Sequence, residues 1–275
     1  MSTLGIIAGN NNFPVYVAQQ AKLSGVDKIV IAGFPDITSS AIEEFSDKLA
    51  WFGIGQLGKL IHYFKQEKAE NILMAGQIPH RLVFRAMKLD LRGIKFLARH
   101  KSWNAKNLLE ALIKELEEEG FQWMDSSYYL QSQLASLGIL AGKTPVESQW
   151  DDIALGWRTA KQMADLDIGQ TVVVKNGVVI AVEAMEGTDE TIVRAGKLAG
   201  KGAVVVKVAR THQDLRYDVP LVGQTTLHSL KEAGSSVLVI EADKTLIMEK
   251  GDFLRQADEL GIIVIGKKDD LGSSY

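Results

Sequence analysis

The sequence predicts an α/β protein with two domains: an N-terminal Rossmann-like domain built on a parallel sheet, and a C-terminal mixed α/β domain. In the first half, short apolar runs alternate with segments of helical spacing, which is typical of a parallel sheet covered by helices. In the second half, Asn176-Gly177 lies between two apolar runs, which indicates an antiparallel hairpin. The chain has 275 residues, and since domains commonly hold about 100 to 150 residues, two are expected.

The elements of the first half follow from apolar spacing and turn residues. Pro14 suits the first turn of a helix that follows the first apolar run. The pattern loosens around Gly142 and Pro145, which favours a linker at residues 138–149. We therefore place the boundary near residue 135, with domains 1–135 and 136–275. The expected strands are 4–8, 28–32 and 71–75, and the expected helices are 15–24, 56–69 and 104–119.

The second half is expected to form a mixed sheet, because the hairpin precedes further strands that are separated by helices. The expected strands are 171–174, 178–182, 203–208, 237–240 and 262–265, and the expected helices are 151–166, 189–199, 225–233 and 252–260.

Composition excludes several classes of protein. The formal net charge is -3, so no overall basic field favours nucleic acid as a partner. The chain has no cysteine, which excludes disulfides, thiolate zinc sites and cysteine nucleophiles and suits a cytoplasmic protein. No apolar run approaches 18 residues, and the N-terminus does not resemble a signal peptide. Any membrane contact is therefore expected to be peripheral, and the sequence leaves a homodimer open.

Residues 53–59 read Gly-Ile-Gly-Gln-Leu-Gly-Lys, which matches a dinucleotide fingerprint and most of a P-loop. A P-loop needs Ser or Thr next, to bind Mg²⁺, and this chain has Leu60. The fingerprint belongs after the first strand, with an acid about 20 residues later, whereas this segment comes later and residues 73–76 carry no acid. We interpret these glycines as a helix start, with NAD or FAD binding as the alternative.

The turn after the first strand is a better candidate for ligand binding. Gly9, Asn10 and Asn11 follow that strand, and Gly76 and Gln77 follow a later one. Ligands of open α/β sheets bind at the carboxyl ends of strands, and helix N-termini bind anions. These five residues are predicted to contact a phosphate or nucleotide. A tight turn capped by asparagine side chains is the alternative.

Glu186-Gly187-Thr188-Asp189 opens a helix of the second half. Thr188 is expected to cap this helix, and Asp189 to complement its dipole. Gly187 would let an anion approach the exposed backbone N–H groups. The segment is therefore a candidate phosphate contact, and a plain helix cap is the alternative.

A polar loop follows Lys207, which ends an apolar strand. The loop carries Gln213, Asp214, Arg216 and Asp218. Two carboxylates four residues apart, with an arginine between them, can gather a divalent cation and a phosphate. Hydrolysis of a phosphoric anhydride needs such a set. A salt-bridged turn is the alternative.

Other hydrolase signatures are missing, and one segment is strongly basic. The five histidines form no i, i+4 pair, and no Gly-x-Ser-x-Gly occurs, which argues against zinc and serine hydrolases. Residues 81–101 hold seven basic side chains and one acid, a local charge of +6, interleaved with apolar residues. This pattern favours a surface for anionic lipid, with an ordinary solvated helix as the alternative.

These motifs together resemble the UDP-2,3-diacylglucosamine pyrophosphohydrolase family of the LpxI type, which acts in lipid A biosynthesis. The similarity covers nearly the whole chain. Asn11 departs from the family, which usually has glycine there, and Arg210-Thr211-His212 replaces a frequent Lys-Pro-Gly. The residues that carry the resemblance are Gly5–Gly9 with Pro14, Ala75-Gly76, Leu108–Gly120, Asp152-Ile153 with Gly156, Asp167–Gln170, Ala181–Ala184, Glu186–Asp189, Gln213-Asp214, Arg216, Asp218, Pro220 and Gly223.

The resemblance implies Mg²⁺-dependent hydrolysis of the diphosphate to UMP and 2,3-diacylglucosamine 1-phosphate, with contact to the inner membrane surface where a diacylated substrate resides. We assign Asp218, Asp214 and Arg216 as catalytic, with Asp214 and Asp218 also as Mg²⁺ ligands. The expected substrate contacts are Gly9, Asn10, Asn11, Gly76, Gln77, Gly187, Thr188, Asp189, Lys207 and Gln213. A nucleotide-dependent oxidoreductase and a non-catalytic nucleotide-sugar-binding protein are the competing hypotheses.

Overall fold

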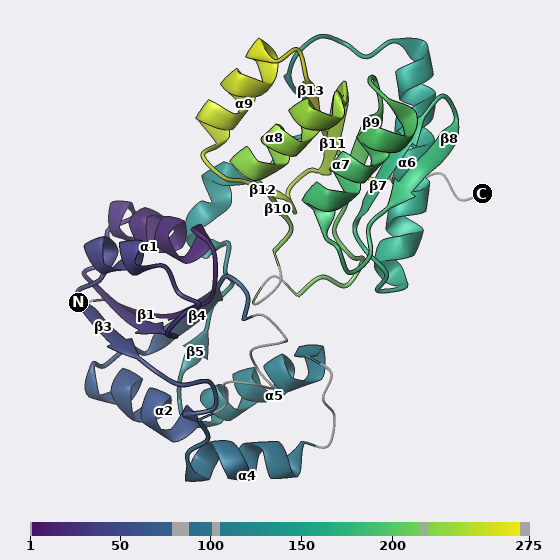
Figure 1. Ribbon diagram of the computed structural model, residues 1–275. Helices are drawn as coiled ribbons and strands as arrows, with labels where there is room; N and C mark the ends of the chain where they lie inside the picture. Colours follow the sequence, from purple (N-terminus) through teal and green to yellow (C-terminus); the bar gives the residue numbers. More distant parts are fainter. Residues whose placement is uncertain (1, 79–87, 101–104, 215, 217–218, 270–275) are drawn as a thin grey trace. The chain divides into compact units, whose positions relative to one another are not determined.

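The computed structural model describes residues 2–78, 88–100, 105–214, 216 and 219–269. These residues form two compact units (Figure 1). Unit 1 comprises residues 2–130 together with Arg216, and unit 2 comprises residues 131–214 and 219–269. Unit 1 contains a parallel sheet and unit 2 a mixed sheet, so the predicted fold class is confirmed.

Unit 1 is a Rossmann-like three-layer structure. Its five parallel strands have the order β3-β2-β1-β4-β5, so the chain reverses direction across the sheet between β1 and β4, where such folds bind ligands. Helix α1 covers one face, and α2, α4 and α5 cover the other (Figure 1). The strands are β1 (Thr3–Ala8), β2 (Lys28–Gly33), β3 (Lys48–Trp51), β4 (Asn71–Ala75) and β5 (Gln122–Trp123), and the helices are α1 (Phe13–Leu23), a 3₁₀ helix η1 (Ser40–Phe45), α2 (Leu57–Gln66), α4 (Leu91–Arg99) and α5 (Ala105–Glu118).

The core of unit 1 explains why α2 forms where its apolar stripe predicts. Phe64 of α2 is fully buried and belongs to one cluster with Ile7 of β1, Ile72 of β4 and Leu116 of α5. Burying each such side chain contributes about 1.5 to 3 kcal/mol. The helix is therefore stabilised by its packing against the sheet and α5.

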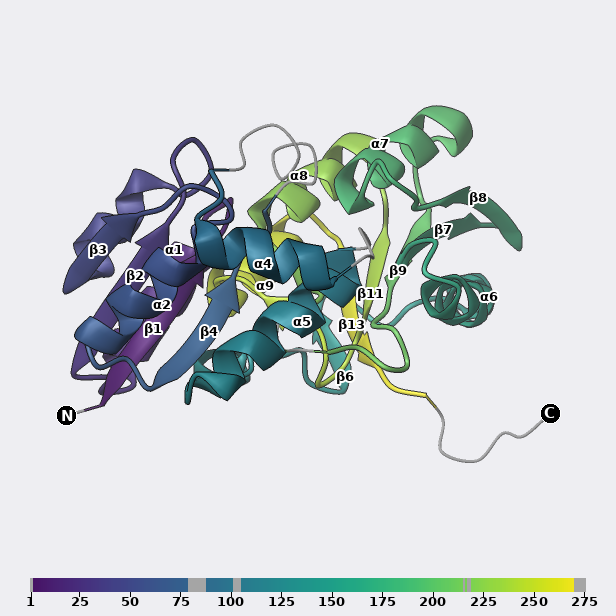
Figure 2. The same ribbon diagram turned by 90° about the horizontal axis from the view of Figure 1, so that it is seen from below.

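Unit 2 is a second three-layer structure, with a six-stranded sheet in the order β6-β13-β11-β9-β7-β8. Strands β9, β11 and β13 are parallel, whereas β6, β7 and β8 pair antiparallel. Figure 2 shows α6 end-on at one face, with α7 and α8 across the sheet from it. The elements are η2 (Tyr128–Gln133), which begins in unit 1, β6 (Gly138–Ala141), α6 (Glu147–Asp165), β7 (Thr171–Lys175), β8 (Val178–Val182), α7 (Thr188–Ala199), β9 (Val204–Lys207), β10 (Leu221–Val222), α8 (Gln224–Ala233), β11 (Val237–Glu241), β12 (Leu246–Ile247), α9 (Lys250–Glu259) and β13 (Ile263–Lys267).

Successive valines of β9 pack alternately against the two helical layers of unit 2. Val204 and Val206 pack with Trp157 of α6, whereas Val205 packs with Ile192 of α7 and Leu230 of α8. Because successive side chains of a strand point to opposite faces, a run of valines fits a strand that is buried on both sides.

Two parts of the predicted organisation are corrected. Residues 138–149 are not a linker, because Gly138–Ala141 forms edge strand β6 against β13 and α6 already begins at Glu147. Strands β3, β5, β10 and β12 were not expected, since each has only two to four residues and so gives little periodic signal.

The predicted hairpin is confirmed between β7 and β8. Asn176 and Gly177 both have positive φ, 51° and 75°, as a type I′ turn requires. Buried Asp152 of α6 accepts the N–H groups of both, at 2.9 Å (Oδ2 to Asn176) and 2.6 Å (Oδ1 to Gly177). This aspartate therefore fixes the turn to the helix beneath it.

Asp152→Ala is expected to destabilise unit 2 by about 2 kcal/mol, because hydrogen bonds to a charged acceptor typically contribute about 1.5 to 3 kcal/mol. Thermal unfolding followed by circular dichroism measures this. Asp151→Ala is the matched control, since Asp151 is the exposed neighbour in the same helix. Equal melting temperatures for the two variants would contradict the assigned role.

None of the helices in the part of the chain that the structure describes is both long enough and apolar enough to span a membrane.

Candidate active site

In unit 1, the loops that follow β1 and β4 interlock through their backbones. The Gly9 N–H donates to the Ala75 carbonyl at 2.7 Å, and the Asn10 N–H donates to the Gln77 carbonyl at 2.8 Å. The Gln77 N–H donates in turn to the Asn10 side chain at 3.0 Å. The structure thus brings the predicted residues of the two loops together at the carboxyl edge of the sheet.

Glycine is required where these two loops cross. A Cβ on Gly9 would lie 2.6 Å from the Gly76 carbonyl carbon, and one on Gly76 would lie 2.5 Å from the Asn10 carbonyl oxygen. Gly76 also has a φ of +78°, which side chains disfavour. The next residue along the first loop, Asn11, adopts the left-handed region at φ 64° and leads into the N-terminus of α1, where an anion is favoured.

In unit 2, the N-terminus of α7 carries a hydrogen-bonded polar cluster. The Lys207 ammonium at the end of β9 donates to the Thr188 hydroxyl at 3.0 Å and to the Leu221 carbonyl at 2.9 Å. The Thr188 hydroxyl donates to Glu183 at 3.1 Å and lies 3.2 Å from the Thr171 hydroxyl. A cation beside a helix N-terminus favours an anion there.

Thr188 does not cap α7, which corrects the prediction. Gly187 occupies the N-cap position with φ +87°, and Thr188 is the first helical residue. Thr188 therefore uses its hydroxyl to connect Glu183 with Lys207. A Cβ at Gly187 would meet no atom within 4 Å, so the side of the helix start that Gly187 faces is open within the described structure.

The two acids that flank this helix start differ. Glu186 accepts from its own backbone N–H and from Arg194, and these hydrogen bonds lower the pKa of its carboxyl. Asp189 instead has a buried Oδ1 atom without a hydrogen-bond partner among the described residues. That oxygen is an acceptor that a ligand hydroxyl or a cation can satisfy.

The predicted catalytic loop involves both units. Gln213 accepts the Arg210 N–H at 2.9 Å in unit 2, and Asp214 is the last residue of this part of unit 2. Arg216 belongs to unit 1, where its carbonyl accepts from Ser126 at 2.9 Å. The predicted domain boundary near residue 135 had placed Arg216 in the C-terminal domain. Asp218 lies outside the described residues.

The glycines within residues 53–58 lie close to other residues of this protein. A Cβ on Gly93 of α4 would lie 2.1 Å from the Gly55 carbonyl oxygen, and one on Gly55 would lie 2.5 Å from Leu89. The Asp90 carboxylate accepts the N–H groups of Lys59 and Gly93, at 3.0 and 2.8 Å. These glycines therefore allow α4 to pack closely on the start of α2, as the helix-start interpretation expects.

The residue types predicted as Mg²⁺ ligands suit that ion, because the carboxylates of Asp214 and Asp218 would offer hard oxygen ligands. Within the described residues, Asp189 has a buried oxygen without a hydrogen-bond partner. No group of three or more His, Cys, Asp or Glu side chains that could hold a metal occurs within the described residues. Mg²⁺ does not need one, because it commonly binds through one or two carboxylates, water and substrate phosphates.

Sequence reasoning missed three charged residues that hold the start of the predicted catalytic loop. Lys161 and Asp165 of α6 and Glu241 at the end of β11 contact residues 209 and 211. The Thr211 N–H and hydroxyl, both at 2.9 Å, lower the pKa of the Asp165 carboxyl. Two features of the sequence could have identified these residues. Lys161 lies between Trp157 and Ala164 on the buried face of α6, and Glu241 ends an apolar strand.

The two units define an α/β protein whose polar residues gather at strand ends and helix N-termini, where such folds bind nucleotides and phosphates. The LpxI N-terminal domain model matches residues 3–133, and the LpxI C-terminal domain model matches residues 136–265. The chain belongs to the LpxI family, as the resemblance predicted.

A relative from Caulobacter vibrioides (strain ATCC 19089 / CIP 103742 / CB 15), named UDP-2,3-diacylglucosamine pyrophosphatase LpxI, is 30% identical over 97% of this chain and 98% of its own. This membership confirms the prediction of an enzyme. Among solved structures, the biotin carboxylase domain of a thermophilic 2-oxoglutarate carboxylase is 11% identical, with a TM-score of 0.29 over 63% of this chain and 35% of that chain. An N5-carboxyaminoimidazole ribonucleotide synthetase is 15% identical, with a TM-score of 0.26 over 80% and 47%. Such low scores say nothing about function.

Proposed function

We propose that this chain hydrolyses the diphosphate of UDP-2,3-diacylglucosamine to UMP and 2,3-diacylglucosamine 1-phosphate, with Mg²⁺, in lipid A biosynthesis. The observation that carries the proposal is the match to the Caulobacter pyrophosphatase, which extends over 97% of the chain and so includes both units. The polar cluster at α7 and the interlocked loops of unit 1 supply the kinds of groups that a nucleoside diphosphate needs.

The proposal assigns two groups of substrate contacts. The loops with Gly9, Asn10 and Gln77 contact the nucleotide through the side-chain amides of Asn10 and Gln77, because the backbone N–H groups of all three residues already donate within the loops. Lys207 and the start of α7 bind a phosphate, since both carry positive charge or positive dipole ends. Mg²⁺, when bound at Asp214 and Asp218, supplies positive charge against the diphosphate oxygens.

In the proposed reaction, Asp218 orients a water molecule and accepts its proton. The water oxygen forms a bond to the phosphorus next to the sugar, and the bond from that phosphorus to the bridging oxygen breaks. UMP leaves with the bridging oxygen, and Arg216 stabilises the charge that develops on the phosphate oxygens. The water oxygen remains in the sugar 1-phosphate.

Incubating the purified protein with UDP-2,3-diacylglucosamine tests the proposal. UMP should appear with Mg²⁺ and not with excess EDTA, and turnover should return when Mg²⁺ is restored. In ¹⁸O-labelled water, the label should appear in the sugar 1-phosphate; label in UMP would reverse the assignment of the attacked phosphorus. Tight UDP-sugar binding without turnover would instead identify a binding protein. Enhanced NADH fluorescence on titration with the protein would identify an oxidoreductase.

The diacylated substrate also motivates a peripheral membrane contact through α4, which lies within the basic segment 81–101. Leu91 and Ile94 of this helix are 80% and 51% exposed, and Lys95 is exposed beside them. Arg92 is paired with Glu115 at 2.8 Å and with Glu119, and Arg99 lies 3.6 Å from Glu115. Part of the +6 charge is thus neutralised within unit 1, and residues 81–87 and 101 lie outside the described residues.

Leu91→Ser/Lys95→Glu is expected to weaken binding to anionic phosphatidylglycerol vesicles about tenfold, because it removes an exposed apolar side chain and reverses a charge worth about 1 kcal/mol. Turnover of detergent-dispersed substrate should change little. Vesicle sedimentation at low salt measures binding. Lys22→Glu/Leu23→Ser makes the same changes at the exposed end of α1, and equal losses in both variants would argue against α4.

A further inference from the structure

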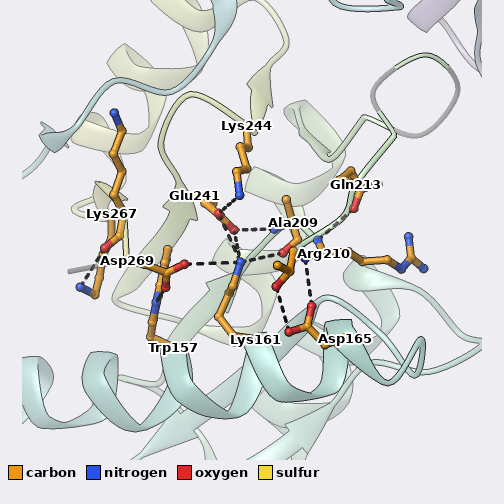
Figure 3. Close-up of polar contacts among 12 residues, drawn as sticks. Trp157, Lys161, Asp165, Ala209, Arg210, Gln213, Glu241, Lys244, Lys267 and Asp269 are labelled. Atoms are coloured by element: carbon orange, nitrogen blue, oxygen red, sulfur yellow. Dashed lines mark hydrogen bonds and ion pairs between the residues drawn. The ribbon is translucent and has the colours of Figure 1, made fainter. Parts of the chain in front are cut away.

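A nearly buried ion pair lies at the carboxyl edge of the parallel strands of unit 2 (Figure 3). The Lys161 ammonium lies 3.2 Å from one carboxylate oxygen of Glu241 and 3.3 Å from the other. The two side chains are 14% and 3% exposed. Lys244 adds a 2.7 Å contact to Glu241, and Asp269 lies 3.8 Å from Lys161.

Both members of this pair also hold the backbone of one residue, Ala209. The Glu241 carboxylate accepts the Ala209 N–H at 2.8 Å, and the Lys161 ammonium donates to the Ala209 carbonyl at 3.1 Å. Ala209 is buried and lies two residues beyond the end of β9. The pair thus binds the two polar groups of a residue that has left the sheet ladder.

The residues that follow are held in the same way, by side chains. Asp165 binds the Thr211 N–H and hydroxyl, each at 2.9 Å, and Asp167 lies 2.7 Å from the Arg210 guanidinium. Gln213 closes the segment by accepting the Arg210 N–H. Figure 3 shows Lys161 and Asp165 of α6, together with Glu241 at the end of β11, pointing toward the loop that contains Ala209 and Arg210.

Stability alone is a weak reason for such a pair. Taking two charges out of water costs about as much free energy as their attraction returns, and apolar replacements are often as stable. A charged pair does, however, define the position of the backbone groups that it binds, because an amide and a carbonyl must both meet their partners.

We infer that Lys161 and Glu241 are positioning residues that fix residues 209–213 and so determine where Asp214 stands in the reaction. The inference rests on the proposed function, since Asp214 is the next residue and is assigned there to the catalytic loop. A displacement of about 1 Å at a reacting group can cost on the order of 10²-fold in rate, so a loosened loop should lower kcat.

Lys161→Met is the main test, because methionine keeps the length of the side chain and leaves Glu241 paired with Lys244 and the Ala209 N–H. We expect kcat to fall at least tenfold, with KM changed less than threefold. Hydrogen–deuterium exchange of the 208–214 peptide, measured without substrate, should become at least tenfold faster, while β9 stays protected. Glu241→Gln keeps the shape of the side chain and one acceptor, and it should also lower kcat and speed exchange of the 208–214 peptide. This variant replaces Lys161→Met as the test if Lys161→Met folds poorly.

Lys28→Met is the matched control. Lys28 of unit 1 likewise binds a carboxylate, Glu67 at 2.7 Å, and a backbone carbonyl, that of Glu67 at 3.3 Å. Lys28→Met should lower the melting temperature and leave kcat within twofold of the wild-type value. Unchanged loop exchange in both test variants, or a loss of kcat that the control matches, would overturn the inference. A wild-type protein without turnover would refute the proposed function, whereas the exchange rates would still decide whether the pair holds the loop.

Discussion

Asp218→Ala is expected to lower kcat by about 10² to 10⁴, the usual contribution of a general acid–base or positioning carboxylate. The carboxylate stabilises the transition state more than the bound substrate, so substrate affinity should change little. Steady-state kinetics, equilibrium binding of UDP-2,3-diacylglucosamine and thermal unfolding, all on the same variant, measure the three quantities.

The competing role for Asp218 is that of a turn residue. Loss of such a residue costs stability of about 1 kcal/mol and leaves the rate unchanged. Asp27→Ala is the control that is expected to behave in this way, because Asp27 accepts the Ser2 N–H at 2.7 Å just before β2, at the amino edge of the sheet. A near-normal kcat with a lowered melting temperature for Asp218→Ala would assign it to the turn.

Gly76→Ala is expected to destabilise unit 1 by about 3 kcal/mol and to abolish nucleotide binding. The positive φ alone costs a side chain about 1 to 2 kcal/mol, and overlap in a packed site adds about 1 to 3 kcal/mol. The new Cβ would lie 2.5 Å from the Asn10 carbonyl oxygen, so the loops that carry Asn10 and Gln77 must separate. Thermal unfolding and calorimetric titration with UDP measure the two effects.

Gly25→Ala separates backbone strain from overlap. Gly25 has a φ of +86°, and a Cβ there would meet no atom within 4 Å. This control should lose about 1 kcal/mol and bind UDP normally. If Gly76→Ala were no less stable than Gly25→Ala and kept its affinity for UDP, the interlocked loops would not form the nucleotide contact.

The glycines at 53–58 show how a local pattern can match two structures. The sequence fits a dinucleotide fingerprint, and rejecting it relied on its place in the chain and on the missing acid. The structure supplies the physical reason for these glycines, because Gly55 lies against Leu89 and Gly93 from a different part of the chain. A close approach to the backbone requires glycine, whether the approaching atoms belong to a helix of the same chain or to a ligand.

The sequence by itself determined what depends on neighbouring residues. Apolar spacing gave the strands and helices that are long enough to show a period, such as the stripe of α2, and Asn176-Gly177 gave the hairpin because its turn needs positive φ at both positions. The combined motifs gave the family. The loops after β1 and β4 could be paired in advance, since parallel strands place their carboxyl ends at one edge.

Only the tertiary structure decided what depends on distant residues. Strand β6 forms because Ile139 pairs with Ile265 of β13, and no local period announces a four-residue edge strand. Lys161 and Glu241 are 80 residues apart and meet only when α6 packs on the sheet. Whether a charged residue remains solvated or becomes a buried partner of a loop depends on these long-range contacts, because the cost of burying a charge is offset only by the particular groups that surround it.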